Sequence, residues 1–173
     1  EPKDSDLRAE RVSADAANAP ERQTEMKMRS VSVGQRDVRG EAKQYLRGQY
    51  TNIDGAMFCQ VCQGELPFKL DDGTEYFEAV EFQNNANMHH QNYLALCPNH
   101  AAMYKHANGS KDVLGEMFDE ISGNSLEVIL AQKDETIYFT KTHINDLKAV
   151  LVAERHALDS KDNEITLEQF DEE

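Results

Sequence analysis

Apolar residues recur at helical spacing in some stretches of this chain and alternate with polar residues in others. The helical spacing predicts helices over residues 4–18, about 36–48, 98 to about 107, about 110–121, and from Thr142 onward. Apolar runs bounded by turn residues predict two hairpins, one pairing 66–70 with 75–82 and the other pairing 126–130 with 136–140. Helices and hairpins that follow one another in this order predict an α+β fold.

The turns and caps of these elements are also visible in the sequence. Asp72 and Gly73 mark the turn of the first hairpin, and Lys133 and Asp134 mark that of the second. Thr142 can cap the last helix, because its hydroxyl can accept a hydrogen bond from a free backbone N–H. We expect three histidines to lie at the surface: His106, His143 and His156.

Changes in composition divide the chain into four segments. Residues 1–49 form a helical, relatively basic arm, and residues 50–109 hold all three cysteines in what we interpret as a zinc module. Residues 110–157 follow as an α-β-β-α extension. Residues 158–173 are rich in acidic side chains and bury little apolar surface, so we expect this tail to be disordered.

The chain of 173 residues is polar and acidic, with a mean hydropathy of −0.70 and a formal charge of −14. It contains neither an apolar run long enough to span a membrane nor the apolar core of a signal peptide. An odd number of cysteines argues against a disulfide framework, and we expect a reducing, cytoplasmic setting. The chain begins at Glu1 rather than Met, so we expect a piece of a larger polypeptide.

Basic residues are concentrated near the N-terminus. Residues 1–49 hold 10 of the 18 Lys and Arg and 9 of the 32 Asp and Glu, which leaves 8 basic against 23 acidic residues in the rest. Because phosphates are neutralised by Lys and Arg, a nucleic-acid contact is expected within residues 22–47. The candidate contacts are Arg29, Arg36, Arg39 and Lys43. The alternative interpretation is a helix face that is only solvated.

Two pairs of metal-ligand residues stand on either side of a 34-residue spacer. Cys59 and Cys62 form the first pair and Cys97 and His100 the second, each with two residues between its members. Zn²⁺ prefers four tetrahedral Cys and His ligands, and a short turn or a helix start can supply two of them. Pro98 predicts that a helix starts at the second pair. The spacing therefore predicts one structural zinc ion per chain, with these four ligands.

Two other interpretations of these residues are open. A Cys-x-x-Cys pair can be a redox centre, although such pairs sit at a helix N-terminus and Cys62 is followed by Gln-Gly-Glu-Leu-Pro. His89 or His90 can replace His100 as the fourth ligand. The place of His100 at a predicted helix start favours His100.

The order of Cys-x-x-Cys, hairpin, Asn92, Leu-Cys-Pro-x-His and helix resembles the treble-clef module of the HNH endonuclease superfamily, in the branch that adds a structural zinc. The resemblance covers about residues 56–107. In that family a strand His acts as general base, an Asn orients the catalytic loop, and a helix His binds the catalytic divalent ion. The matching positions here hold Glu81, Asn92 and Lys105, with His106 next to Lys105.

The resemblance thus implies a degenerate catalytic site, because two of its three positions are altered. If the site is active, Glu81 would bind Mg²⁺ or Mn²⁺, Asn92 would orient the loop and His106 would take the place of the helix His. His89 or His90 would then serve as the base.

Residues 76–82 and 94–103 are also similar to the C-terminal zinc segments of large bacterial multidomain proteins, some of which are suspected of roles in defence against foreign DNA. Three functions follow as hypotheses. The leading one is a zinc-stabilised recognition module that binds nucleic acid or a protein partner within a larger bacterial protein or complex. The second is an active metal-dependent nuclease with displaced catalytic residues. The third is an architectural domain that docks a partner through the extension and the acidic tail.

Overall fold

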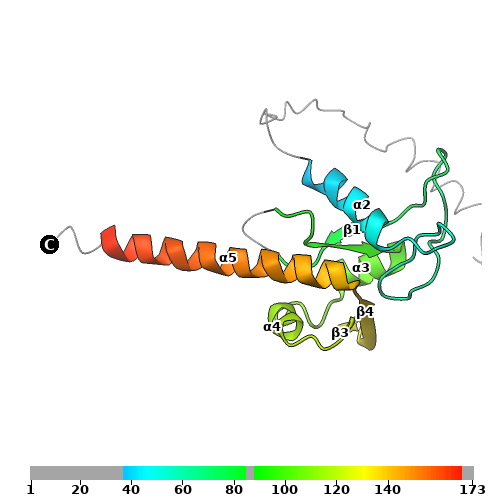
Figure 1. Cartoon of the computed structure of the whole chain (residues 1–173). Coiled ribbons are helices and arrows are strands. Elements are labelled where there is room, and N and C mark those ends of the chain that lie inside the picture. The colour runs from blue at the N-terminus through cyan, green and yellow to red at the C-terminus, as the bar shows by residue number, and fades with distance from the viewer. Residues whose placement is uncertain (1–36, 85–87, 169–173) are drawn as a thin grey trace, which may run out of the picture. The chain divides into compact units, whose positions relative to one another are not determined.

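The computed structural model describes residues 37–84 and 88–168 of the chain. Within these residues it contains four helices and two antiparallel sheets of two strands each. In chain order the elements are α2 (Val38–Gln49), β1 (Glu78–Glu81), β2 (Tyr93–Leu96), α3 (Pro98–His106), α4 (Leu114–Asp119), β3 (Ser125–Leu130), β4 (Lys133–Tyr138) and α5 (Lys141–Glu168) (Figure 1). The fold is mixed α and β, as the apolar pattern predicts, and elements α4 to α5 have the predicted α-β-β-α order.

The sheet of β1 and β2 is buried on both faces. The two strands are antiparallel, with Glu78 opposite Leu96. One face packs on α2 through a cluster of Ala42, Leu46, Tyr50, Met57, Phe77, Ala79, Tyr93 and Ala95. The other face, with Val80 and Leu94, joins the main core, to which α3, α4, α5 and the second sheet also contribute. Alternate residues of β1 therefore serve two cores, because successive side chains of a strand point to opposite faces.

The first predicted hairpin is shorter than expected. Its turn forms at Gly73, which has a φ of +82°, and the few backbone hydrogen bonds between its two sides lie around the bridge of Lys69 and Glu75. Residues 66–70 form no strand, because they run along an exposed surface and Pro67 has no N–H for a ladder. The strand predicted after the turn pairs with β2 instead.

The hairpin of β3 and β4 turns two residues earlier than predicted. Leu130 pairs with Lys133, so Ala131 and Gln132 form the turn, with φ values of 49° and 64°. Asn and Gly favour such positive φ values, and neither occupies this turn, so the sequence carried no signal there. The register is set by the core, since alternate residues of β3 are buried and a shift by one residue would expose them.

Helix α2 lies close to the predicted range of 36–48. Asp37 caps it, with its carboxylate accepting a hydrogen bond from a backbone N–H of the first turn at 3.0 Å. The predicted helix over 4–18 and the predicted phosphate contacts Arg29 and Arg36 lie outside the described residues.

Helix α5 begins earlier than predicted and is capped by Thr140 rather than Thr142. The Thr140 hydroxyl accepts a hydrogen bond from the N–H of His143 at 3.1 Å. The helix continues to Glu168 and so enters the segment 158–173, for which disorder stays a prediction. No helix in the described ranges is both long and apolar enough to cross a membrane.

Candidate metal centre

Cys59 and Cys62 lie in a tight turn of the backbone. The N–H of Gln63 donates a hydrogen bond to the carbonyl of Cys59 at 2.8 Å, and the N–H of Cys59 donates to the carbonyl of Gly64 at 3.1 Å. Gln63 adopts a φ of 52°, which lets the chain reverse within this turn. Cys59 is buried, whereas Cys62 is exposed.

The second ligand pair lies at the start of α3. Cys97 is the residue before the helix, and Pro98 occupies its first turn, as the sequence predicts. The N–H of Ala101 donates to the carbonyl of Cys97 at 2.9 Å. Cys97 and His100 are therefore neighbours on one side of the first helical turn.

The structure brings the four predicted ligands together. The ligand atoms of Cys59, Cys62, Cys97 and His100 all lie within 4.8 Å of one another. His100 Nδ1 is 3.2 Å from Cys97 Sγ and 3.6 Å from Cys59 Sγ. With bonds of about 2.3 Å to sulfur and about 2.1 Å to nitrogen, a tetrahedral zinc ion would separate such atoms by roughly 3.6 Å. The cluster can therefore hold a metal ion with the size and ligand preference of zinc.

The environment of Cys59 distinguishes a metal centre from a redox pair. Burial raises the pKa of the Cys59 thiol, because a buried thiolate loses its hydration. A redox-active pair requires the opposite, a lowered thiol pKa at a helix N-terminus. Metal ligands must also be thiolates, but there the bound cation supplies the stabilisation that burial removes. Burial thus gives the first cysteine no redox activation, and the case for a metal ligand rests on the geometry of the four-residue cluster.

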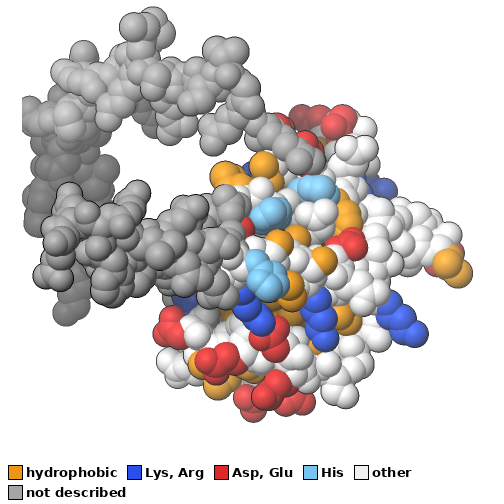
Figure 2. All heavy atoms as spheres, turned by 60° about the vertical axis from the view of Figure 1, so that its left-hand side comes forward, with side chains coloured by type: hydrophobic (Ala, Val, Ile, Leu, Met, Phe, Trp, Pro, Cys, Tyr) orange, Lys and Arg blue, Asp and Glu red, His pale blue; other side chains and the backbone are white. Residues whose placement is uncertain are grey.

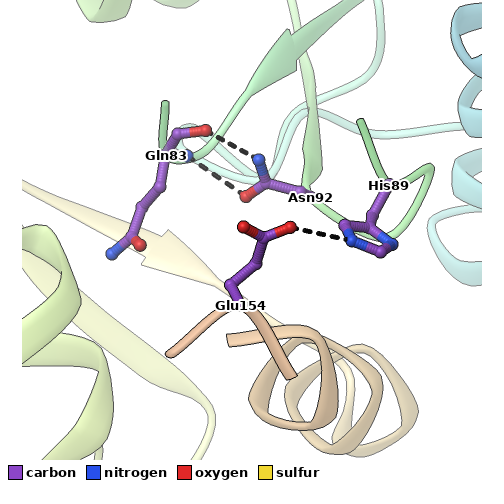
Figure 3. Close-up of polar contacts among 4 residues, drawn as sticks. All are labelled: Gln83, His89, Asn92 and Glu154. Atoms are coloured by element: carbon purple, nitrogen blue, oxygen red, sulfur yellow. Dashed lines mark hydrogen bonds and ion pairs between the residues drawn. The ribbon is translucent and has the colours of Figure 1, made fainter. Parts of the chain in front are cut away.

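His89 and His90, the alternative fourth ligands, lie outside the Cys3His cluster. His89 Nε2 is 3.0 Å from Glu154 Oε1 of α5 (Figure 3). His90 Nδ1 is 3.6 Å from Glu41 Oε2 of α2. Each imidazole therefore contacts a carboxylate on a helix, and together they connect their loop to α2 and α5.

Gln60, between the two cysteines of the turn, connects that turn to both sheets. Its N–H donates to the carbonyl of Ala95 in β2 at 3.0 Å, and its carbonyl accepts from the N–H of Tyr138 in β4 at 2.8 Å. Its buried side chain accepts from the N–H of Ala95 at 2.7 Å and donates to the carbonyl of Tyr138 at 2.8 Å and the hydroxyl of Tyr50 at 2.9 Å. The turn that holds Cys59 and Cys62 is therefore joined to the two sheets through the backbone and the side chain of Gln60.

The hydrogen-bond network continues through His143, whose predicted surface position is wrong. His143 is fully buried, with Nδ1 2.6 Å from the Tyr50 hydroxyl and Nε2 2.9 Å from the carbonyl of Gln91. A carbonyl only accepts, so Nε2 carries the proton and Nδ1 accepts from Tyr50. Burial lowers the pKa of His143 to about 4, which keeps the ring neutral near pH 7. No local sequence pattern indicates this burial, because these partners lie 93 and 52 residues away along the chain.

A furrow opens beside β1 and the C-terminal end of α3. It consists of a hollow of about 760 Å³ and an adjoining one of about 140 Å³, which share Arg39, Ala79 and Lys105 in their walls. We call the two hollows together the β1 furrow. Its basic residues are Arg39, Lys43, Lys105 and Lys111. Its acidic residues are Glu78, Glu81, Asp112 and Glu116.

One of the four cations of the β1 furrow is neutralised by a neighbour, Lys105, which forms an ion pair with Glu78. The other three form no ion pair with any residue that the structure describes. The carboxylate of Glu81 accepts a hydrogen bond from the hydroxyl of Tyr93 at 2.9 Å. The β1 furrow is thus of mixed charge, with four basic and four acidic side chains, and the face drawn in Figure 2 likewise shows Lys and Arg side chains scattered among Asp and Glu.

The three residues implied by the nuclease resemblance have different surroundings. Glu81 ends β1 and lines the β1 furrow. Asn92 is buried, and its amide donates to the carbonyl of Gln83 at 2.7 Å and accepts from the N–H of Gln83 at 3.2 Å, which fixes the strand ends (Figure 3). His106 is exposed at the end of α3, and within the described residues no hydrogen bond joins it to Glu81 or Asn92.

Sequence reasoning missed two of the four cations of the β1 furrow, Lys105 and Lys111. Because Lys105 follows His100 on α3, its distance from the metal centre could be predicted from the sequence. The position of α2 across the sheet could not be predicted in this way. No protein-family model, curated protein or solved structure matches this chain.

Proposed function

We propose that this chain is a metal-stabilised recognition module that binds nucleic acid along the β1 furrow. The observation that carries the proposal is the grouping of Arg39, Lys43 and Lys111, three cations without an ion-pair partner among the described residues, along one furrow. Arg39 and Lys43 come from the helix expected to contact phosphates, and Lys111 follows α3. Cations that are free of internal partners are available for phosphates.

The metal ion fits this function as a structural element. A tetrahedral zinc ion with four protein ligands has no open position for a substrate, which is typical of structural sites. Cys97 and His100 fix the start of α3, and Lys105 lies near its end. Binding of such an ion contributes an apparent free energy of about 10–16 kcal/mol in small zinc domains. The metal would therefore hold the β1 furrow in shape without contacting the nucleic acid.

The overall charge of −14 would affect the strength of this binding and its dependence on salt. Long-range attraction to a polyanion is weak for so acidic a chain, so the affinity must come from local contacts with the three cations. Each phosphate contact releases counterions, which makes the binding strongly dependent on salt. We therefore expect modest affinity at low salt and a steep loss as salt rises.

The test compares two triple variants that remove the same charge. Arg39→Gln/Lys43→Gln/Lys111→Gln neutralises the β1 furrow, and Lys133→Gln/Lys141→Gln/Lys148→Gln neutralises three lysines outside it. Anisotropy of labelled oligonucleotides measures the dissociation constant between about 50 and 200 mM salt. The furrow variant is expected to lose binding and to reduce the salt slope by about 2–3, whereas the control keeps both.

Equal losses in the two variants would show that only net charge matters and would refute a role for the β1 furrow. No binding by the unaltered protein would refute the proposal and favour the protein-docking hypothesis. Cleavage of the oligonucleotide that requires Mg²⁺ or Mn²⁺ and disappears in Glu81→Ala would place an enzyme where we propose a binding module.

A further inference from the structure

Phe68 and Tyr76 form a stacked aromatic pair on the short hairpin before β1. Their ring centroids are 4.9 Å apart and their planes are inclined by 11°. The backbone supports the pair, because the N–H of Tyr76 donates to the carbonyl of Phe68 at 3.1 Å. Phe68 is 49% exposed, and neither residue belongs to either core cluster. The pair therefore presents a planar apolar surface to solvent without serving the interior.

This aromatic pair lies at one end of the β1 furrow. Tyr76 lines the smaller hollow together with Arg39, Lys43 and Lys105. An exposed aromatic ring beside cations is the combination that binds single-stranded nucleic acid, because cations contact the phosphates while bases stack on the ring. A duplex keeps its base faces inside, so it could use only the cations. The arrangement thus favours a strand with unpaired bases.

We propose that Phe68 and Tyr76 form a stacking platform for an unpaired base, and that the β1 furrow accordingly takes single-stranded rather than duplex nucleic acid. This inference rests on the proposed function, since the cations must hold the strand before a base can stack. Stacking tolerates any base, because every base has a flat aromatic face. The platform therefore adds affinity for single strands without a requirement for one sequence.

The chain contains no Trp, which allows a direct test of stacking. Phe68→Trp keeps a flat aromatic ring and places a single indole on the platform. Titration with a single-stranded oligonucleotide is expected to quench its emission, because a stacked base quenches an indole. An abasic strand with the same number of phosphates is expected to bind more weakly and to leave the emission nearly unchanged. Equal quenching by both strands would overturn the proposal.

A second pair of variants separates stacking from the folding of the hairpin. Phe68→Ala is expected to weaken binding of a single strand by roughly 5- to 150-fold, the range for loss of one base–aromatic stack, with the salt slope unchanged. Leu70→Ala is the control, since Leu70 is 44% exposed on the same hairpin. It is expected to bind like the unaltered protein.

Three outcomes would overturn the stacking platform: equal losses in Phe68→Ala and Leu70→Ala, an equal loss of affinity for the abasic strand, or duplex binding as tight as single-strand binding. Each of these leaves the proposed function intact, because nucleic acid is still bound. Failure of the unaltered protein to bind any strand would remove the proposed function itself, and the inference with it.

Discussion

Hydrogen bonds around His143 run in a single direction. Gln60 donates to the Tyr50 hydroxyl, Tyr50 donates to His143 Nδ1, and His143 Nε2 donates to the carbonyl of Gln91. A proton added to Nδ1 would take away the acceptor that Tyr50 uses, and it would place a charge among buried groups. The neutral ring is thus part of the native structure.

Acid should therefore destabilise the folded protein through His143. The pKa of an unfolded histidine is about 6.5, and burial lowers that of His143 to about 4. Between these values the unfolded state binds the extra proton, so the free energy of unfolding falls as the pH falls through this window. The complete shift corresponds to about 3 kcal/mol. Urea denaturation near pH 7 and near pH 4.5 measures it.

His143→Gln is the control for this prediction. The metal ligands also take up protons in acid, but they do so in both proteins, so the difference between the proteins isolates His143. We expect the variant to be less stable near pH 7 and to lose less stability on acidification. An identical loss in both proteins would contradict the assignment of this pH dependence to His143.

A second prediction for a single residue concerns the contribution of the Gln60 side chain to stability. Gln60→Ala removes three side-chain hydrogen bonds and takes the partner from the N–H of Ala95 and the carbonyl of Tyr138, whereas the Tyr50 hydroxyl keeps its bond to His143. We expect a loss of about 2–4 kcal/mol in the free energy of unfolding. Gln44→Ala, at an exposed site of α2, is the matched control and should change stability by less than about 0.5 kcal/mol. Chemical denaturation of the metal-loaded proteins decides between these values.

Among the elements, the hairpin of β3 and β4 is held in a turn that its residues do not favour. Ala131 and Gln132 both adopt positive φ, which costs non-glycine residues roughly 1 kcal/mol each. Ala131→Asn/Gln132→Gly supplies the preferred residues of such a turn and should raise the free energy of unfolding by about 1 kcal/mol. Lys133→Gly, at a paired position of β4, should lower it. A lower melting temperature for the Asn-Gly variant in thermal denaturation would contradict the assignment of positive φ to these two residues.

The elements show which signals the sequence carries and which it lacks. The start of α3 was predictable because Pro98 and the ligand spacing are local signals. The pairing of β1 was not, because hairpin rules favour the nearest segment, whereas β1 pairs with β2 across a polar loop. The buried His143 was also missed, since its partners are far away in sequence. The sequence thus predicted local features such as a helix start, but it did not predict which distant segments pair.

Across the whole molecule, we expect stability to depend on the metal centre. Cys62 is exposed, so Cys62→Ser disturbs little packing and would change stability by less than about 0.5 kcal/mol in a protein without a metal. With zinc bound, the same change removes one of four ligands and should cost several-fold more, with loss of the ion. Native mass spectrometry should show one zinc ion per chain before the change and none after it. Retention of full stability in Cys62→Ser would refute a structural metal.

The position of Gln60 also has a consequence for folding during synthesis. The turn of Cys59 and Cys62 and the sheet of β1 and β2 leave the ribosome before β4, so Gln60 can already bond to Ala95 while its carbonyl and side-chain N–H, which later bond to Tyr138, are still hydrated. An ion bound at the cluster would set the turn early, so that Gln60 could pair with Tyr138 as soon as β4 forms. A chain synthesised without zinc would lack this preformed turn, on which β4 would otherwise pair. The amount of folded protein in a cell would then follow the supply of zinc more closely than the rate of translation.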